Sequence, residues 1–103
     1  MKAIINARIV LEDGILEGAA LTYDRVIHAI HPDGRVPEGC ECLDAGGRLL
    51  LPGLIDVHMH GYCGREVTEA TPEAIRAIAA SLVRDGVTGF LPTLGSAPMD
   101  TVC

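Results

Sequence analysis

Two histidines, His58 and His60, lie two residues apart at the end of a short apolar run. If that run is a strand, side chains at i and i+2 point to the same face, so both imidazoles can bind one metal ion through neutral nitrogens. Asp56 lies one step earlier on that face, where it can orient the histidines. A metal ion held there lowers the pKa of a bound water to about 7 and creates hydroxide at neutral pH. The alternative is that the histidines are ordinary core or surface residues.

The elements around the motif favour the metal interpretation. Residues 54–58 are mostly apolar without alternation, which is typical of a strand buried on both faces, as in a parallel sheet. A loop with Gly61 and Gly64 follows, and residues 87–91 form a second buried strand closed by Pro92. Parallel sheets and barrels hold their active sites at the carboxyl ends of their strands, where this motif lies.

A helix is predicted between these two strands. Thr71 suits the N-cap, Pro72 the first helical position, and Gly86 a left-handed C-cap. Apolar side chains recur at the spacing of a single helical face: Ile75, Ile78, Ala79, Leu82 and Val83. Strand, loop, helix and strand together make a βαβ unit, which is almost always a right-handed parallel crossover.

The residues before Pro52 indicate short strands separated by turns. Asp13-Gly14 and Pro32-Asp33-Gly34 are turn signals. The extended stretches are expected at residues 3–11, 15–22, 25–30, 42–44 and 48–51. This spacing fits a small β-sandwich or an open sheet. His28 and His31 in this region are interpreted as packing or surface residues. We place the boundary between the two regions near Pro52, dividing residues 1–51 from 52–103.

Composition excludes several classes of protein. With 103 residues, 49% of them apolar, the chain has enough apolar content for a globular fold. The formal net charge of -6 argues against a nucleic-acid surface, which needs a basic stripe. No apolar run reaches the ~20 residues of a membrane span, and the first residues do not read as a signal peptide. A cytoplasmic location, with the four cysteines as reduced thiols, is expected.

Side chains near the histidines are candidates for the wall of a pocket. Cys63 lies in the following loop and is expected to line the pocket, with a role as third metal ligand as the less favoured alternative. Thr93 ends the second strand on the functional face, where a polar role near the substrate is expected. Arg65 and Glu66 are placed at the pocket mouth. An arginine there can meet a phosphate, although a solvated loop charge is the simpler interpretation.

These segments resemble a known family. Residues 51–61, LPGLIDVHMHG, are similar to the first barrel strand of the amidohydrolase superfamily. The continuation HGYCG at 60–64 and the segment GVTGFLPT at 86–93 are similar to N-acetylglucosamine-6-phosphate deacetylases. Dihydroorotase-like members usually carry an arginine soon after the second histidine, where this chain has Gly61. Adenine deaminase-like members differ in the same loop.

The resemblance implies an α/β fold. The chain would hold the start of a metal-dependent (β/α)8 TIM barrel, one βαβ unit, preceded by a small β-sandwich-like region. His58 and His60 would be metal ligands. Four other residues would contact these ligands from outside the metal site or line the pocket: Asp56, Gly61, Cys63 and Thr93. The cofactor would be a divalent metal, with zinc favoured over iron, cobalt or manganese.

The activity implied is that of a hydrolase acting on a linear amide. Such an enzyme removes acetate from N-acetylglucosamine 6-phosphate, in amino-sugar catabolism, by attack of a metal-activated water. Its partner is that small molecule, with no nucleic acid or membrane involved, and the full-length protein is expected to be a homo-oligomer, a dimer. The alternatives are a dihydroorotase- or imidazolonase-like cyclic-amide hydrolase, or a truncated non-catalytic module for binding or assembly.

The barrel is expected to be incomplete in this chain. A (β/α)8 barrel needs about 250 residues, whereas the stretch from Leu54 to Cys103 has room for two strands and one helix. A second barrel helix should begin at residues 100–103. The remaining metal ligands and the acid–base aspartate are expected beyond Cys103, so no catalytic residue is assigned within the chain. We therefore expect the chain by itself to be inactive.

Overall fold

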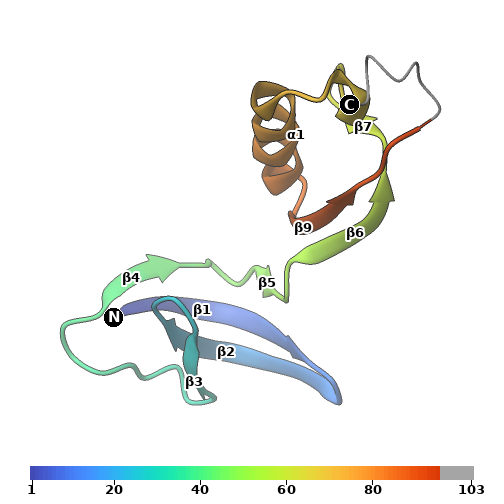
Figure 1. Ribbon diagram of the computed structural model, residues 1–103. Helices are drawn as coiled ribbons and strands as arrows, with labels where there is room; N and C mark the ends of the chain where they lie inside the picture. The colour runs from blue at the N-terminus through green and yellow to red at the C-terminus, as the bar shows by residue number, and fades with distance from the viewer. Residues whose placement is uncertain (96–103) are drawn as a thin grey trace. The chain divides into compact units, whose positions relative to one another are not determined.

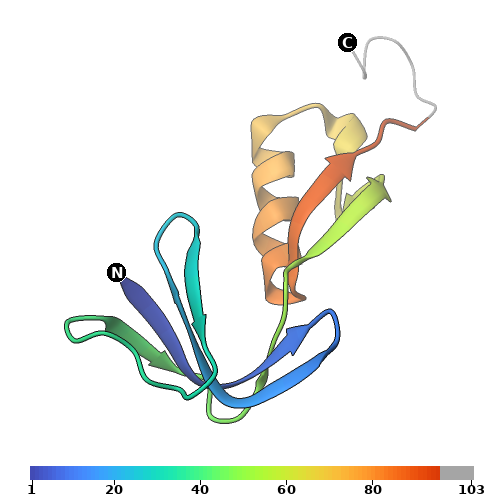
Figure 2. The same ribbon diagram turned by 90° about the horizontal axis from the view of Figure 1, so that it is seen from below.

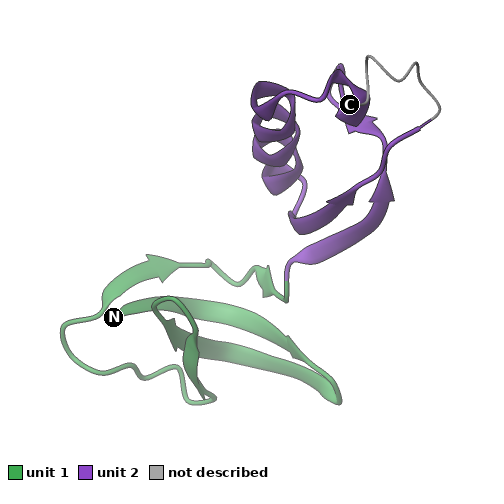
Figure 3. Cartoon of the chain, viewed as in Figure 1, with its two compact units in different colours: residues 1–52 green, residues 53–103 purple. Residues whose placement is uncertain are grey.

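The chain divides into two compact units, residues 1–52 and 53–103 (Figure 3). The computed structural model describes residues 1–95, so the second barrel helix expected at 100–103 lies outside the described residues. Each unit has its own cluster of buried apolar side chains. The division falls between Pro52 and Gly53, at the change in sequence character, and each unit is described by itself.

Unit 1 is built around a long antiparallel hairpin (Figure 1). Its strands are β1 (Lys2–Leu11), β2 (Gly14–Tyr23), β3 (Ile27–His31), β4 (Glu41–Asp44) and β5 (Leu49–Leu50). The third strand begins at Ile27, two residues later than expected from the sequence. The reason is a turn around Asp24, whose carboxylate accepts the backbone N–H groups of Arg25 and Val26 and so withdraws them from the sheet.

All five strands of unit 1 belong to one sheet, because β1 pairs on both of its edges. β2 runs antiparallel along one edge, while β4 and β5 run parallel along the other, giving the order β3-β2-β1-β4 with β5 also on β1. Its buried cluster contains Ala7, Ile9, Ala19 and Leu21. Among residues 1–52 the structure therefore shows the open sheet, and the predicted sandwich has no second layer there.

Unit 2 is a βαβ unit, as the sequence predicted. β6 (Leu54–Met59) and β9 (Val87–Pro92) run parallel, and α1 (Pro72–Arg84) connects them and lies along one side of the pair (Figure 2). A short hairpin that the sequence did not indicate is inserted after β6. It consists of β7 (Gly61–Tyr62) and β8 (Arg65–Glu66), and the 3-10 helix η1 (Val67–Glu69) follows it.

The ends of α1 follow the sequence closely. The Thr71 hydroxyl accepts the backbone N–H of Ala74 at 3.2 Å, and Pro72 is the first helical residue. Asp85 is the C-cap, and Gly86 follows it with a φ of 84° in the left-handed region. Ala74, Ile78 and Leu82 form the buried stripe. Val83 was predicted to share this face but is 62% exposed, because it lies about 100° further round the helix than Leu82.

The prediction that β6 and β9 are buried on both faces is wrong for the described residues. Ile55 is 70% exposed, Val57 68% and Leu91 58%. Only Met59 of β6 is buried in the cluster that contains Ile78 and Leu82 of α1. Within residues 53–95 these two strands pair only with each other, and no further layer covers their remaining apolar side chains.

The core of unit 2 gives a first prediction. Ile78 has no exposed surface and is the largest fully buried side chain among the described residues. Ile78→Ala should therefore lower the free energy of unfolding by about 2–5 kcal/mol, the cost of lost burial plus a cavity. Denaturant titration followed by helical circular dichroism measures this change. Val83→Ala, on the same helix, is the control and should cost less than about 0.5 kcal/mol; equal losses would contradict the assigned core.

Candidate metal centre

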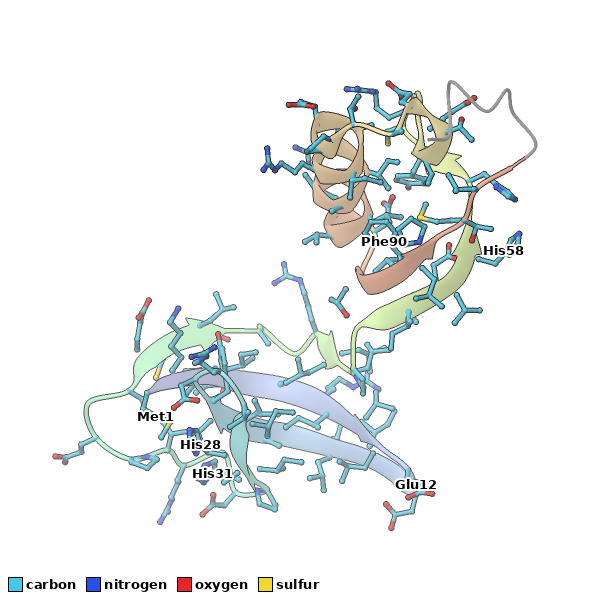
Figure 4. All side chains as sticks on the ribbon, viewed as in Figure 1. Met1, Glu12, His28, His31, His58 and Phe90 are labelled. Atoms are coloured by element: carbon cyan, nitrogen blue, oxygen red, sulfur yellow. The ribbon has the colours of Figure 1, made fainter. Side chains whose placement is uncertain are left out.

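The side chains of His58 and His60 converge at the carboxyl end of β6. His58 is the fifth residue of that strand, and His60 follows its last residue; both are exposed. Their Nε2 atoms are 3.2 Å apart, and the two rings lie nearly perpendicular, with an interplanar angle of 87°. Figure 4 shows His58 beside this strand end. The predicted placement of both imidazoles on one face is what brings these nitrogens together.

The separation of the two Nε2 atoms suits a shared metal ion. Two imidazole nitrogens bound tetrahedrally to zinc at about 2.0–2.1 Å lie roughly 3.3–3.4 Å from each other. The 3.2 Å between His58 and His60 is close to this value. The same distance also suits a hydrogen bond from one neutral ring to the other. In a neutral imidazole, the hydrogen-bond partner of one ring nitrogen determines whether the other nitrogen has a lone pair for a metal.

For His60 that partner is a main-chain carbonyl. Its Nδ1 lies 2.9 Å from the carbonyl oxygen of Thr93. A carbonyl oxygen only accepts, so Nδ1 carries the proton, and the Nε2 of the neutral ring keeps its lone pair for a metal. The Thr93 N–H in turn donates to the Met59 carbonyl at 2.8 Å, which joins the ends of β6 and β9. The register of these strands thus sets the tautomer of His60.

Thr93 contributes through its backbone. The sequence suggested a polar side-chain role near a substrate, but the Thr93 hydroxyl donates to the Leu91 carbonyl at 3.1 Å. The main-chain contact with His60 had no signal in the sequence, because every residue type carries a carbonyl.

Asp56 also contacts the backbone: its Oδ1 accepts the N–H of His58 at 3.1 Å. This contact supports an orienting role for Asp56 through the main chain rather than through a ring.

The loop after the histidines folds back against them. Gly61 has no room for a side chain, because an added Cβ would lie 2.4 Å from the carbonyl oxygen of Arg65. An open pocket of about 630 Å³ lies beside His60. Its lining residues are His60, Gly61, Tyr62, Gly64, Arg65, Glu66, Thr68 and Gly95. Cys63 is exposed at the tip of the hairpin and is not among them, so its expected place in the pocket wall is not observed.

The other two histidines have structural partners in unit 1. His28 Nε2 lies 2.8 Å from Asp24 Oδ2, and this hydrogen bond is the main cause that lowers the pKa of Asp24 to about 2. His31 Nε2 lies 3.1 Å from the Thr22 hydroxyl. Across residues 1–95, no three or more His, Cys, Asp or Glu side chains gather as a metal site. Within residues 1–95, His58 and His60 are therefore a pair of candidate metal ligands, where a catalytic zinc usually has three.

Known proteins resemble the chain along its whole length. An N-acetylgalactosamine-6-phosphate deacetylase of Escherichia coli O157:H7 is 36% identical over 104 residues, covering 99% of this chain and 26% of that protein. The crystal structure of N-acetylglucosamine-6-phosphate deacetylase from Pasteurella multocida matches 97% of this chain and 27% of its own with a TM-score of 0.86 and 30% identity. The chain is a relative of the amino-sugar phosphate deacetylases of the amidohydrolase superfamily. The resemblance inferred from residues 51–64 and 86–93 is thereby confirmed.

The matches cover only part of each related protein. The chain spans about a quarter of the length of these deacetylases. A shorter match, 40% identical over 55 residues and covering 53% of this chain, is to an L-hydantoinase of Paenarthrobacter aurescens. No family model matches the chain. No helix within residues 1–95 is long and apolar enough to span a membrane.

Proposed function

We propose that this chain is the N-terminal part of a metal-dependent deacetylase that removes acetate from N-acetylglucosamine 6-phosphate. The observation that carries the proposal is the pair of Nε2 atoms 3.2 Å apart at the end of β6, in a chain aligned over almost all of its length with amino-sugar phosphate deacetylases. In this proposal, unit 1 belongs to a small β domain and unit 2 is the first βαβ portion of a TIM barrel.

Each residue of the centre has a part in the proposal. His58 and His60 hold a divalent ion, for which zinc is favoured because imidazole is among its preferred ligands; iron, cobalt and manganese are the alternatives. When bound, such an ion would polarise an amide carbonyl and lower the pKa of a bound water to about 7. The Thr93 carbonyl keeps the proton of His60 on Nδ1, and Asp56 fixes the backbone of His58. The proton-transfer group and the remaining ligands are expected outside the described residues.

Metal removal and substrate choice test the proposal directly. The complete protein should release acetate from N-acetylglucosamine 6-phosphate, lose this activity on dialysis against a chelator, and regain it with zinc. Acetate assays before and after each step measure this. Hydantoin is the comparison substrate, because part of the chain matches a hydantoinase. Hydrolysis of hydantoin without acetate release would replace the proposal with the cyclic-amide alternative, and no hydrolysis of either would favour the non-catalytic one.

Two further expectations remain predictions. A homodimer is expected for the complete protein, and light scattering of the purified protein checks it. A cytoplasmic location is expected as well, and cell fractionation checks that.

A further inference from the structure

The pocket beside His60 is formed by the short hairpin β7–β8 and the residue Gly95 that follows β9. It therefore opens at the carboxyl ends of β6 and β9, the end at which parallel sheets and barrels bind their substrates. Arg65, Glu66 and Thr68 supply its charged and hydroxyl groups, and Tyr62 its aromatic wall. The sequence did not predict this hairpin.

The hairpin is held firmly relative to His60. The Val67 N–H donates to the His60 carbonyl at 2.8 Å, directly after β8. The Tyr62 hydroxyl donates to the carboxylate of Asp85 at the end of α1. The two short strands pair Gly61 with Glu66 and Tyr62 with Arg65. Side chains on the hairpin consequently have a defined position with respect to the metal-binding histidine.

Arg65 is itself fixed by an ion pair. Its Nη2 lies 2.9 Å from Glu69 Oε1, and its Nε lies 3.1 and 3.2 Å from the two carboxylate oxygens. Hydrogen bonding to Glu69 raises the pKa of Arg65, and the same contact lowers the pKa of Glu69. Nη1 takes no part in this pair. The planar guanidinium is thus oriented by Glu69, and within residues 1–95 Nη1 makes no hydrogen bond, so it can donate to a ligand in the pocket.

The charges around the pocket disfavour an anion. Glu66 lines the pocket, and the guanidinium of Arg65 is already paired with Glu69, so a phosphate placed here would meet one carboxylate and a cation whose charge is already matched. The Glu66 carboxylate accepts from the Thr68 hydroxyl at 3.2 Å and from the backbone N–H of Glu69, and its oxygens have further lone pairs. Fixed donors beside fixed acceptors suit hydroxyl groups, which donate and accept at once.

We propose that Arg65 is a specificity-determining residue that donates to a ring hydroxyl of the amino sugar, with Glu66 as the neighbouring acceptor, and that the phosphate binds elsewhere. This inference rests on the proposed deacetylase function. The sequence suggested two interpretations of Arg65, a phosphate contact and a solvated loop charge. The proposed contact with a sugar hydroxyl differs from both. Glucosamine and galactosamine differ only in the orientation of one ring hydroxyl, so a fixed donor can discriminate between them.

The test compares both epimers with Arg65→Gln in the complete protein. The ratio of kcat/KM for N-acetylglucosamine 6-phosphate to that for N-acetylgalactosamine 6-phosphate should change about tenfold, the effect of losing one charge-assisted hydrogen bond. The inhibition constant of inorganic phosphate should stay within about twofold of wild type, because Arg65 does not hold that group. Arg76→Gln, on the exposed side of α1, is the matched control and should change neither quantity.

A second variant distinguishes the loss of the guanidinium donor from misfolding of the hairpin. Arg65→Lys keeps a charge for Glu69 but loses the planar fork, so it should shift the epimer ratio in the same direction. An unchanged ratio in both variants would overturn the proposal, and so would a roughly tenfold rise in the inhibition constant of phosphate, since that would make Arg65 a phosphate ligand. If the wild-type protein deacetylates neither epimer, the proposed function fails and this inference fails with it.

Discussion

Replacing His60 with alanine in the complete protein is expected to lower kcat/KM for N-acetylglucosamine 6-phosphate on the order of 10³-fold, because a bound ion supplies several kcal/mol of transition-state stabilisation. His58→Ala should have a similar effect, since the two Nε2 atoms 3.2 Å apart are proposed to share one ion. Elemental analysis after dialysis should show less than the wild-type metal content in both variants. The double variant should be no worse than either single one, because residues that act as a unit are not additive.

The matched control is a histidine with a known partner elsewhere. His28 is exposed and hydrogen-bonds to Asp24 in unit 1, so His28→Ala removes an imidazole without touching the metal centre. Its metal content and kcat/KM should equal those of wild type. Full metal content with unchanged turnover in His60→Ala would show that the convergence of the two rings has another cause, and the metal centre would have to be abandoned.

The sequence predicted those parts of the fold that local signals determine. The Thr71 cap, the proline after it and the left-handed Gly86 fix both ends of α1, and each is visible in the residue types alone. The spacing of His58 and His60 likewise predicts two imidazoles on one face, since side chains at i and i+2 of an extended chain point to the same side. These features depend on a few neighbouring residues, so no knowledge of the tertiary fold was needed.

Features that depend on distant partners were missed or wrong. The contact that sets the tautomer of His60 comes from the carbonyl of Thr93, 33 residues away, and a carbonyl has no sequence signature. The strands β7 and β8 have two residues each, too few for any periodicity to appear. Apolar runs such as residues 54–58 predict burial, but whether burial occurs depends on which other elements cover them. In the described residues α1 covers only part of the β6–β9 pair.

Residues 1–103 alone should show no deacetylation of N-acetylglucosamine 6-phosphate, even with added zinc. The described residues supply two proposed metal ligands, His58 and His60, whereas a catalytic zinc site usually has three, plus a group that transfers protons. Ile55, Val57 and Leu91 are also more than half exposed on strands that pair only with each other. Side chains of this kind on open strands invite association with other chains.

The measurement is acetate release by purified residues 1–103 beside the complete protein at equal concentration and with equal zinc. The complete protein is the positive control, and its His60→Ala variant sets the background of the assay. Turnover by residues 1–103 above that background would contradict the expectation and would mean that His58 and His60, with solvent as the remaining ligands, suffice for catalysis. Activity only at high protein concentration would instead mean that copies of the chain complete the site for one another through the exposed strands.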